Sequence, residues 1–383
     1  MTVTFLSPDL LDRIHSRAEE TDRLNSFPHE DLAELTAAGY LTAFVPQEFG
    51  GAGLTAEQIC AEQTRLAQAA PATALGINMH HIIVGLGRHL VASGIDSGRQ
   101  ILEGAMNGDI FAFGISEPGN DLVLFGSMTE ARPDGEGGYS FHGLKVFTSL
   151  SPVWTKLMTF GRDDSGDDGP HSVFAILDRE RGGFTVRDDW DTLGMRGTQS
   201  NSTMLEGAHA PAEQVLQRVE PGPSKEPVIF GIFSYFEVFL AATYLGIGNR
   251  AIEVAAEKVK TRRSVLHQDV YANDPDIRWR LASAALRMNS AAAEVTLLAR
   301  DLDAGRDRGD LWYPQLSAAK NAASEASLYA VEQAIRSTGG SSYSNSNELS
   351  RLYRDVLAGL FQPSDQESLH SSWANVVLGP ITE

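Results

Sequence analysis

Apolar residues recur at intervals of three and four in the first hundred residues, which is the spacing of helices with one buried face. Leu10, Leu11 and Ile14 belong to one such segment, and Leu32 and Leu35 belong to the next. The glycine-rich sequence VPQEFGGAGL breaks the pattern, which then resumes through two further segments. We therefore predict an N-terminal helical domain over residues 1–108.

The pattern changes near Asp109. Short runs rich in aromatic and β-branched residues follow one another, separated by Gly, Asp and Pro: FAFGI, GYSFHGLKVFTS, KLMTFGR, HSVFAILD and GFTVRDDW. Several short strands with turn signals between them are typical of an all-β unit. We predict a central antiparallel β-barrel-like domain over residues 109–222.

Long helical patterns return after the linker PGPSKEP. The later segments are rich in Ala, which favours helices and close helix packing. We predict a C-terminal four-helix bundle over residues 223–383, and hence an α+β multidomain fold. The chain lacks alternating strands and helices and has no GxGxxG sequence, so a doubly wound dinucleotide fold is excluded.

The charge and the cysteine content narrow the function. A formal net charge of −19 argues against nucleic acid or an anionic membrane surface as a partner. The single cysteine, Cys60, excludes an intramolecular disulfide and a thiolate metal cage. We see no signal peptide and no run of about 18 apolar residues. We therefore expect a cytoplasmic protein with no metal site and no membrane partner.

Five segments, taken in order, resemble motifs of the acyl-CoA dehydrogenase family. They span nearly the whole chain: FPHEDLAELTAAGYLTAFVPQEFGGAGLT (27–55), FAFGISEPGND (111–121), GYSFHGLKVFTS (138–149), LGMRGTQSNSTMLEGAHAPAEQVL (193–216) and STGGSSYSNSNELSRLYRDV (337–356). The resemblance implies a scaffold of helices, sheet and helices that binds FAD.

The resemblance also implies which residues contact the flavin. Ile115 and Ser116 end a strand just before a Glu-Pro turn, where backbone N–H groups and a hydroxyl can face the polar edge of the ring. Phe147 takes the family's aromatic position against the ring, and Thr148 and Ser149 reach its N5 side. The competing interpretation is that Phe147 is a core residue of the β-domain.

The ADP half of FAD would need cations or bare backbone. Arg262 is similar to the helix-borne Arg of the family, although the usual RxxFG pattern here reads RRSVL. Gly339 and Gly340 match a GG turn, and Arg336 stands where the family often has Gln. In the family these residues reach the FAD of a neighbouring subunit, so the resemblance implies a homodimer or homotetramer.

The position of the catalytic base departs from the family pattern. Most members carry a Glu nine residues after the Arg of the RD pair, which here is Pro363. A minority carry it ten residues before the Gly of an LG pair, which here is Phe236. Glu237 is the next residue and lies in an apolar run, where a carboxylate is costly unless it is paired or used. We predict Glu237 as the base, and the competing interpretation is a partnered or interface Glu.

The substrate implied by the resemblance is an acyl thioester on CoA or on an acyl carrier protein. The family's Asp and Arg that help to place CoA are replaced by Ala241 and Tyr244, which leaves the carrier open. His80 and His81 are adjacent on a predicted helix and point about 100° apart, so they do not form a two-ligand metal face. We expect one of them, and Tyr244, to line the substrate pocket.

Three functions follow from these residues. The first is FAD-dependent α,β-dehydrogenation of an acyl thioester, with a separate electron acceptor. The second is a flavin-dependent monooxygenase on the same fold, which needs oxygen and a flavin reductase; such members often place a His where this chain has Gln362, so His80 or His81 would have to serve. The third is a non-catalytic relative.

Overall fold

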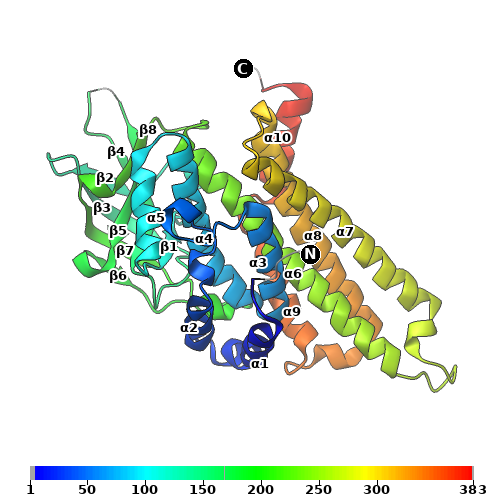
Figure 1. Ribbon diagram of the computed structural model, residues 1–383. Coiled ribbons are helices and arrows are strands. Elements are labelled where there is room, and N and C mark those ends of the chain that lie inside the picture. Colours follow the sequence, from blue (N-terminus) through cyan, green and yellow to red (C-terminus); the bar gives the residue numbers. More distant parts are fainter. Residues whose placement is uncertain (1–4, 168, 382–383) are drawn as a thin grey trace.

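The computed structural model describes residues 5–167 and 169–381 as a helical part, a sheet and a second helical part (Figure 1). The first part contains α1 (Pro8–Leu24), α2 (His29–Ala37), α3 (Ala56–Ala69), α4 (Pro71–Ala92) and α5 (Arg99–Met106). Local sequence sets the helix starts. The Ser7 hydroxyl accepts the N–H of Leu10 ahead of α1, and Thr55 with Gln58 forms a capping box ahead of α3.

The central part is one open sheet. Its strands are β1 (Phe111–Gly114), β2 (Glu130–Pro133), β3 (Tyr139–Lys145), β4 (Lys156–Asp163), β5 (His171–Asp178), β6 (Phe184–Val186), β7 (Thr203–Ala210) and β8 (Val215–Val219). They are ordered β6-β7-β3-β2-β4-β5-β8, and β1 pairs with β4. The end strands β6 and β8 do not pair with each other, so the barrel-like closure that we predicted is not found.

The sheet is also mixed rather than antiparallel. Strand β1 runs parallel to β4, with Phe111 opposite Lys156, and β2 makes a single parallel pair with β4. The remaining pairs are antiparallel. Residue alternation identifies strands but carries no information on the direction of a partner that is distant in sequence. The antiparallel prediction was therefore wrong for β1.

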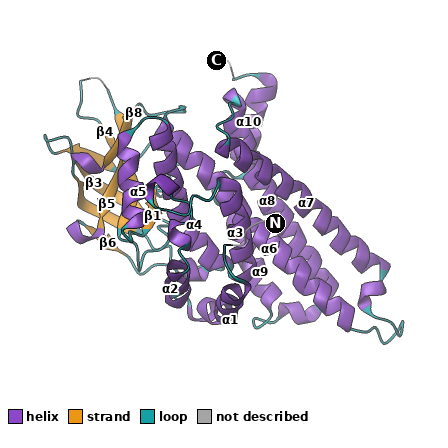
Figure 2. Ribbon diagram, in the orientation of Figure 1, coloured by secondary structure: helices purple, strands orange, loops and turns teal. Residues whose placement is uncertain are grey.

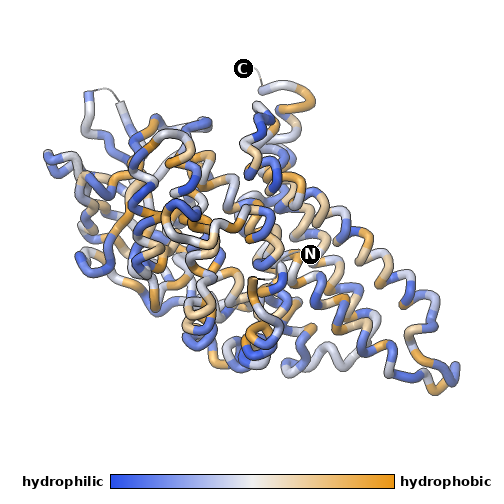
Figure 3. The backbone as a smooth tube through the Cα atoms, viewed as in Figure 1, coloured by the Kyte–Doolittle hydropathy of each residue, from blue (hydrophilic) through white to orange (hydrophobic). Residues whose placement is uncertain are grey.

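The second helical part has three long helices and two short ones among the described residues. These are α6 (Pro227–Thr261), α7 (Pro275–Asp303), α8 (Trp312–Thr338), α9 (Glu348–Val356) and α10 (Gln366–Leu378). A four-helix bundle is thus not confirmed. Helices α7 and α8 alternate hydrophobic and hydrophilic positions along their length, as amphipathic helices do (Figure 3).

Helix α6 forms the centre of the molecule. Within the described residues it is the one helix long and apolar enough to cross a membrane, with a hydropathy of 1.8 over its most apolar window. However, 83% of that window is buried inside the protein, where α3, α4 and α8 pack on it. A core helix of a folded protein passes the same test of length and composition.

The strands gather at one end of the molecule, and α7 and α8 extend away from them at the other (Figure 2). Helices α4 and α5 lie between the sheet and the long helices, and α4 contacts both β1 and α6. Helix α6 begins beside the sheet and ends at the far end of the molecule (Figure 1). The two ends of α6 are therefore far apart, which matters for the candidate site.

Candidate functional site

The ends of β1 and β3 meet at one edge of the sheet. The N–H of Val146 donates to the carbonyl of Ser116 at 2.9 Å. This bond places Ile115, which is buried, and Ser116, which is half-buried, beside the turn that begins at Phe147. The structure therefore brings together all five residues that we predicted to contact the flavin ring.

The turn after β3 exposes an aromatic ring. Phe147 has a left-handed backbone with φ of 58°, and 62% of the residue is exposed. Such a conformation is costly for a bulky residue and occurs mostly at functional sites. The competing interpretation of Phe147 as a core residue is thus wrong. Beside it, the hydroxyl of Thr148 is buried and has no hydrogen-bond partner among the described residues.

A second loop holds this turn in place. The hydroxyls of Ser149 and Ser200 are 2.8 Å apart, and the N–H of Leu150 donates to the carbonyl of Thr198 at 3.1 Å. From the same loop region, the Trp190 ring meets the Phe147 ring edge-on with 6.2 Å between centroids. The motif LGMRGTQSNS therefore acts as a support for the Phe147 turn.

A buried ion pair lies behind this edge of the sheet. Nζ of Lys145 is 2.6 Å from Oε1 of Glu117, and the two side chains are 0% and 1% exposed. Burial opposes charge on both groups. Lys145 and the other donors nevertheless hold the pKa of Glu117 down at about 2, while desolvation lowers the pKa of Lys145 to about 8. Sequence reasoning missed this pair.

Helix α6 faces the same edge through Phe236, not Glu237. The rings of Phe236 and Phe113 of β1 are 5.7 Å apart. One residue along a helix turns the side chain by about 100°, so Glu237 points elsewhere. It is fully buried, and its Oε1 accepts the hydroxyl of Ser364 at 2.8 Å. Burial raises the pKa of Glu237, and nearby Lys320 opposes that rise.

Lys320 of α8 ties down the chain that precedes α10. Its buried ammonium donates to the carbonyls of Gly359, Gln362 and Ser364 at 2.9, 2.6 and 3.1 Å. Desolvation lowers its pKa to about 8. The segment that includes Pro363 is thus packed against Glu237. Oε2 of Glu237 is buried and has no partner among the described residues.

The predicted ADP contacts lie far from the sheet, at the other end of α6 (Figure 1). Arg262 donates to the carbonyl of Thr338 at 2.6 Å and lies over the ring of Tyr271. Gly339, with φ of 76°, leaves room for the Arg262 guanidinium, since an added Cβ would be 3.1 Å from Nη1. An open pocket of about 360 Å³ is lined by Lys258, Thr261, Arg262 and Ser341. Arg336 and Gly340 are exposed nearby.

The predicted substrate residues His80, His81 and Tyr244 are fully buried, and they do not line the Arg262 pocket or the pocket beside α1. His80 is a structural residue: its Nε2 is 2.8 Å from the carbonyl of Leu41, and its Nδ1 accepts the N–H of Phe111. Burial lowers its pKa to about 4.

The other two predicted substrate residues differ in their contacts. His81 has neither ring nitrogen paired among the described residues and packs against the ring of Tyr40. The hydroxyl of Tyr244 donates to Oε1 of Gln362 at 2.6 Å.

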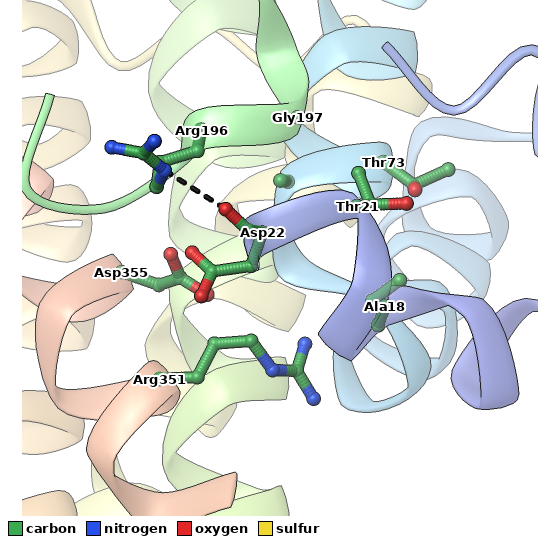
Figure 4. A pocket seen from close by; sticks show the side chains of 10 residues that line it. Ala18, Thr21, Asp22, Thr73, Arg196, Gly197, Arg351 and Asp355 are labelled. Carbon is green, nitrogen blue, oxygen red and sulfur yellow. Dashed lines mark hydrogen bonds between the residues drawn. The ribbon is translucent and has the colours of Figure 1, made fainter. Parts of the chain in front are cut away.

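A small pocket marks the junction of α1, α4, α9 and the loop before β7 (Figure 4). Arg196 donates to the carbonyl of Asp22, and Arg354 pairs with the Asp22 carboxylate. Asp355 is buried and accepts the N–H of Met195 at 2.6 Å, and burial raises its pKa to about 6. Within residues 5–167 and 169–381, no three His, Cys, Asp or Glu side chains gather as a metal site.

The edge formed by β1 and β3 fits a flavin. An exposed aromatic ring beside a buried, unpaired hydroxyl matches a flat ring ligand with a polar edge, and Thr148 and Phe147 supply these two features. The arrangement of helices, sheet and helices with this site is that of a flavoprotein oxidoreductase.

The chain belongs to the acyl-CoA dehydrogenase family. Residues 10–100 match the description "Acyl-CoA dehydrogenase, N-terminal domain" and residues 228–361 match "Acyl-CoA dehydrogenase, C-terminal domain". These matches coincide with the helical parts on either side of the sheet. The family resemblance drawn from the five motifs is thereby confirmed.

Several relatives are similar over almost the whole chain. L-evernosamine nitrososynthase of Micromonospora sp. is 28% identical over 94% of this chain and 86% of its own. The putative acyl-CoA dehydrogenase YdbM of Bacillus subtilis is 26% identical over 92% and 91%. The structure of KijD3 in complex with FMN and dTDP-3-amino-2,3,6-trideoxy-4-keto-3-methyl-D-glucose has a TM-score of 0.86 at 26% identity, covering 98% of this chain and 92% of that one.

Proposed function

We propose that this protein is a flavin-dependent monooxygenase, which uses reduced flavin and molecular oxygen. One observation carries the proposal. The two positions at which the family keeps its carboxylate base hold Pro363 and Phe236, and the ring of Phe236 contacts Phe113 of β1. Proton abstraction from carbon needs a base within reach of the substrate, and an oxygenation that starts from reduced flavin has no such requirement.

Glu237 is poorly placed to replace the missing base. Its Oε1 is engaged by Ser364, and Lys320 stabilises its charge from the side of α8. Its side chain is rotated by about 100° around the helix axis from that of Phe236. The contacts of Glu237 thus join α6, α8 and the segment before α10, and they favour a packing role.

The relatives agree with this choice. L-evernosamine nitrososynthase is named for the oxidation of an amino sugar nitrogen, and the KijD3 complex contains FMN together with an amino sugar nucleotide. An amine-bearing small molecule is therefore the first substrate class to test. The residues that we assign to the ADP half of FAD lie at the other end of the molecule (Figure 1). The flavin-ring site of one chain therefore does not by itself distinguish FMN from FAD.

When bound and reduced, the flavin supplies the two electrons that activate oxygen, so that one oxygen atom enters the substrate and the other leaves as water. The protein's own part is to hold and shield the ring. Phe147 and Trp190 would offer an apolar wall, the unpaired hydroxyl of Thr148 would face the ring's polar edge, and half-buried Ser116 lies beside the same turn.

The test uses the purified chain with FMN or FAD, NADH and a separate flavin reductase. Consumption of oxygen that rises on addition of an amino sugar nucleotide, with product gaining one oxygen by mass, supports the proposal. Catalase and superoxide dismutase remove the peroxide and superoxide that free reduced flavin forms, and a reaction without the protein gives the background uptake of oxygen. Oxidised protein that instead bleaches anaerobically with an acyl thioester contradicts it.

Dehydrogenation of an acyl thioester is the second candidate, and one feature of Glu237 favours it. Oε2 of Glu237 is buried and unpaired among the described residues, which leaves it able to accept a proton from a ligand that displaces its neighbours. YdbM, whose name is that of a putative acyl-CoA dehydrogenase, is similar over a comparable length. Anaerobic bleaching separates the two candidates.

We also propose that the protein self-associates. The flavin-ring site and the Arg262 pocket lie at opposite ends of the molecule (Figure 1). One FAD molecule could therefore contact both only if the ring site came from one copy of the chain and the Arg262 pocket from another. On α7, Trp279, Leu286 and Leu297 are 67%, 70% and 48% exposed. Spacings of 7 and 11 residues place them on one helix face, which is the pattern of a helix–helix contact.

A further inference from the structure

Glu117 is a buried charge at this edge of the sheet, and both of its carboxylate oxygens accept hydrogen bonds. Its Oε1 accepts the hydroxyl of Ser127 at 2.6 Å and the N–H of Thr129 at 3.0 Å, besides the Lys145 ammonium. Its Oε2 accepts the side-chain amide of Asn120 and the N–H of Met128, both at 2.7 Å. The Glu117 carboxylate thus holds together the segment that connects β1 to β2, because several residues of that segment donate hydrogen bonds to it.

Lys145 makes the matching contacts from β3. Its ammonium donates to the Phe160 carbonyl at 2.8 Å and lies 4.6 Å from the centre of the Phe160 ring. It is the last residue of β3, two residues before Phe147. The pair therefore connects the segment that contains Ser116 directly to the strand end that sets the Phe147 turn.

Stability alone does not account for such a pair. Removing two charges from water costs about as much as their attraction returns, and apolar replacements of similar volume are often neutral. A fully hydrogen-bonded pair does fix one arrangement of the groups around it. At this place the groups so fixed are the two turns on which the flavin would lie.

We infer that the Glu117–Lys145 pair is a positioning device for the flavin, setting the Ser116 and Phe147 turns in the geometry that binds the ring. The two side chains act through the backbone and do not themselves contact the cofactor. The inference rests on the flavin site of the proposed function, but it holds whichever reaction that flavin performs.

The experiment measures binding of oxidised FMN and FAD to the apoprotein by quenching of flavin fluorescence, with thermal unfolding of the same samples. Glu117→Gln preserves the volume of the side chain, but its NH2 group replaces an oxygen that accepts hydrogen bonds from neighbouring donors. Lys145→Met fills the space against Phe160 and removes the charge. We expect each variant to raise the flavin dissociation constant at least about tenfold. At saturating flavin, the visible circular dichroism of the bound ring should also change.

The ion pair of Lys156 and Asp178, which joins β4 to β5 in the same sheet, is the matched control. Lys156→Met should lower the unfolding temperature without changing the flavin dissociation constant. If Glu117→Gln and Lys145→Met bind flavin within about twofold of the parent chain, the pair does not position the site. A parent chain that binds no flavin would overturn the proposed function itself, and the inference with it.

Discussion

The hydroxyl of Ser364 donates a hydrogen bond of 2.8 Å to Oε1 of Glu237, and both side chains are buried. This contact joins α6 to the segment before α10, so the two regions in which the family carries a base converge in this chain as well. What meets there is a serine hydroxyl, a lysine ammonium and a carboxylate with one free oxygen among the described residues. The convergence makes the role of Glu237 directly testable.

Glu237→Gln should leave oxygenation nearly intact. Gln keeps the shape of the side chain and an oxygen for Ser364, and a general base typically contributes a factor of about 10²–10⁴ to a rate. We expect turnover within about threefold of the parent chain, measured as oxygen uptake and product mass with reduced flavin. A loss of about a hundredfold or more, without a change in flavin binding, would show that Glu237 takes part in the reaction and would contradict its packing role.

Lys320→Met should destabilise the protein by about 2–4 kcal/mol, because the carbonyls of Gly359, Gln362 and Ser364 lose their donor and Glu237 loses a nearby charge. Urea unfolding followed by far-UV circular dichroism measures the change. Lys225→Met is the control, since Lys225 forms an exposed pair with Asp310, and removal of such a pair should change stability little because water screens the charges. Equal effects of the two substitutions would refute a structural role for Lys320.

Phe147→Gly separates cofactor binding from folding. The backbone of residue 147 has φ of 58°, which glycine adopts without strain, and the Phe147 ring is largely exposed. We expect the apoprotein to be unchanged or more stable by up to about 1 kcal/mol, while the flavin dissociation constant rises about tenfold or more as the aromatic contact is lost. A destabilised apoprotein with unaltered flavin binding would show that Phe147 serves the fold.

The fold was largely accessible from the sequence, because periodicity reports which face of an element is buried. The helical segments before Asp109 and after Pro227 and the strands between them follow from that pattern. Sheet closure and strand direction did not follow. The pairing of Phe111 with Lys156 depends on how α4 and α5 carry the chain to the sheet, and that is a property of tertiary packing.

The site was accessible in part. Phe147, Thr148 and Ser116 could be placed through family motifs, since those motifs describe backbone turns. The Glu117–Lys145 pair could not, because a lysine in the run GLKVF has the same pattern whether it faces solvent or a buried carboxylate. The direction of Glu237 was likewise undetermined, since one residue of helix register decides whether a side chain faces the sheet or α8.

Asp355→Asn should change how stability depends on pH. Burial raises the pKa of Asp355 from 3.8 to about 6, and Arg351 and Arg354 oppose the rise while Asp22 adds to it. A raised pKa means that the folded chain binds the proton more tightly, so the contribution of Asp355 to stability is full below pH 3.8 and is lost as pH rises through 6. An asparagine side chain stays neutral and can keep the bond from Met195.

The free energy of unfolding of the Asp355→Asn variant, relative to the parent chain, should therefore increase by about 2–3 kcal/mol between about pH 4.5 and 7. His80, whose pKa is lowered to about 4, has the opposite effect over this range, but it is present in both chains and cancels in the comparison. A difference that stays constant with pH would show that Asp355 does not titrate there.

Leu286→Glu tests self-association through α7. Leu286 is 70% exposed between Trp279 and Leu297 on one helix face, and a charge at the centre of an apolar helix contact is costly to bury. We expect the variant to elute as a monomer of 41.4 kDa by size-exclusion chromatography with light scattering, where the parent chain forms a dimer or tetramer. Leu24→Glu is the control, because Leu24 is an exposed leucine on α1. Should both variants keep the parent assembly, the contact between copies lies elsewhere; if the parent chain is itself monomeric, the proposal of self-association fails.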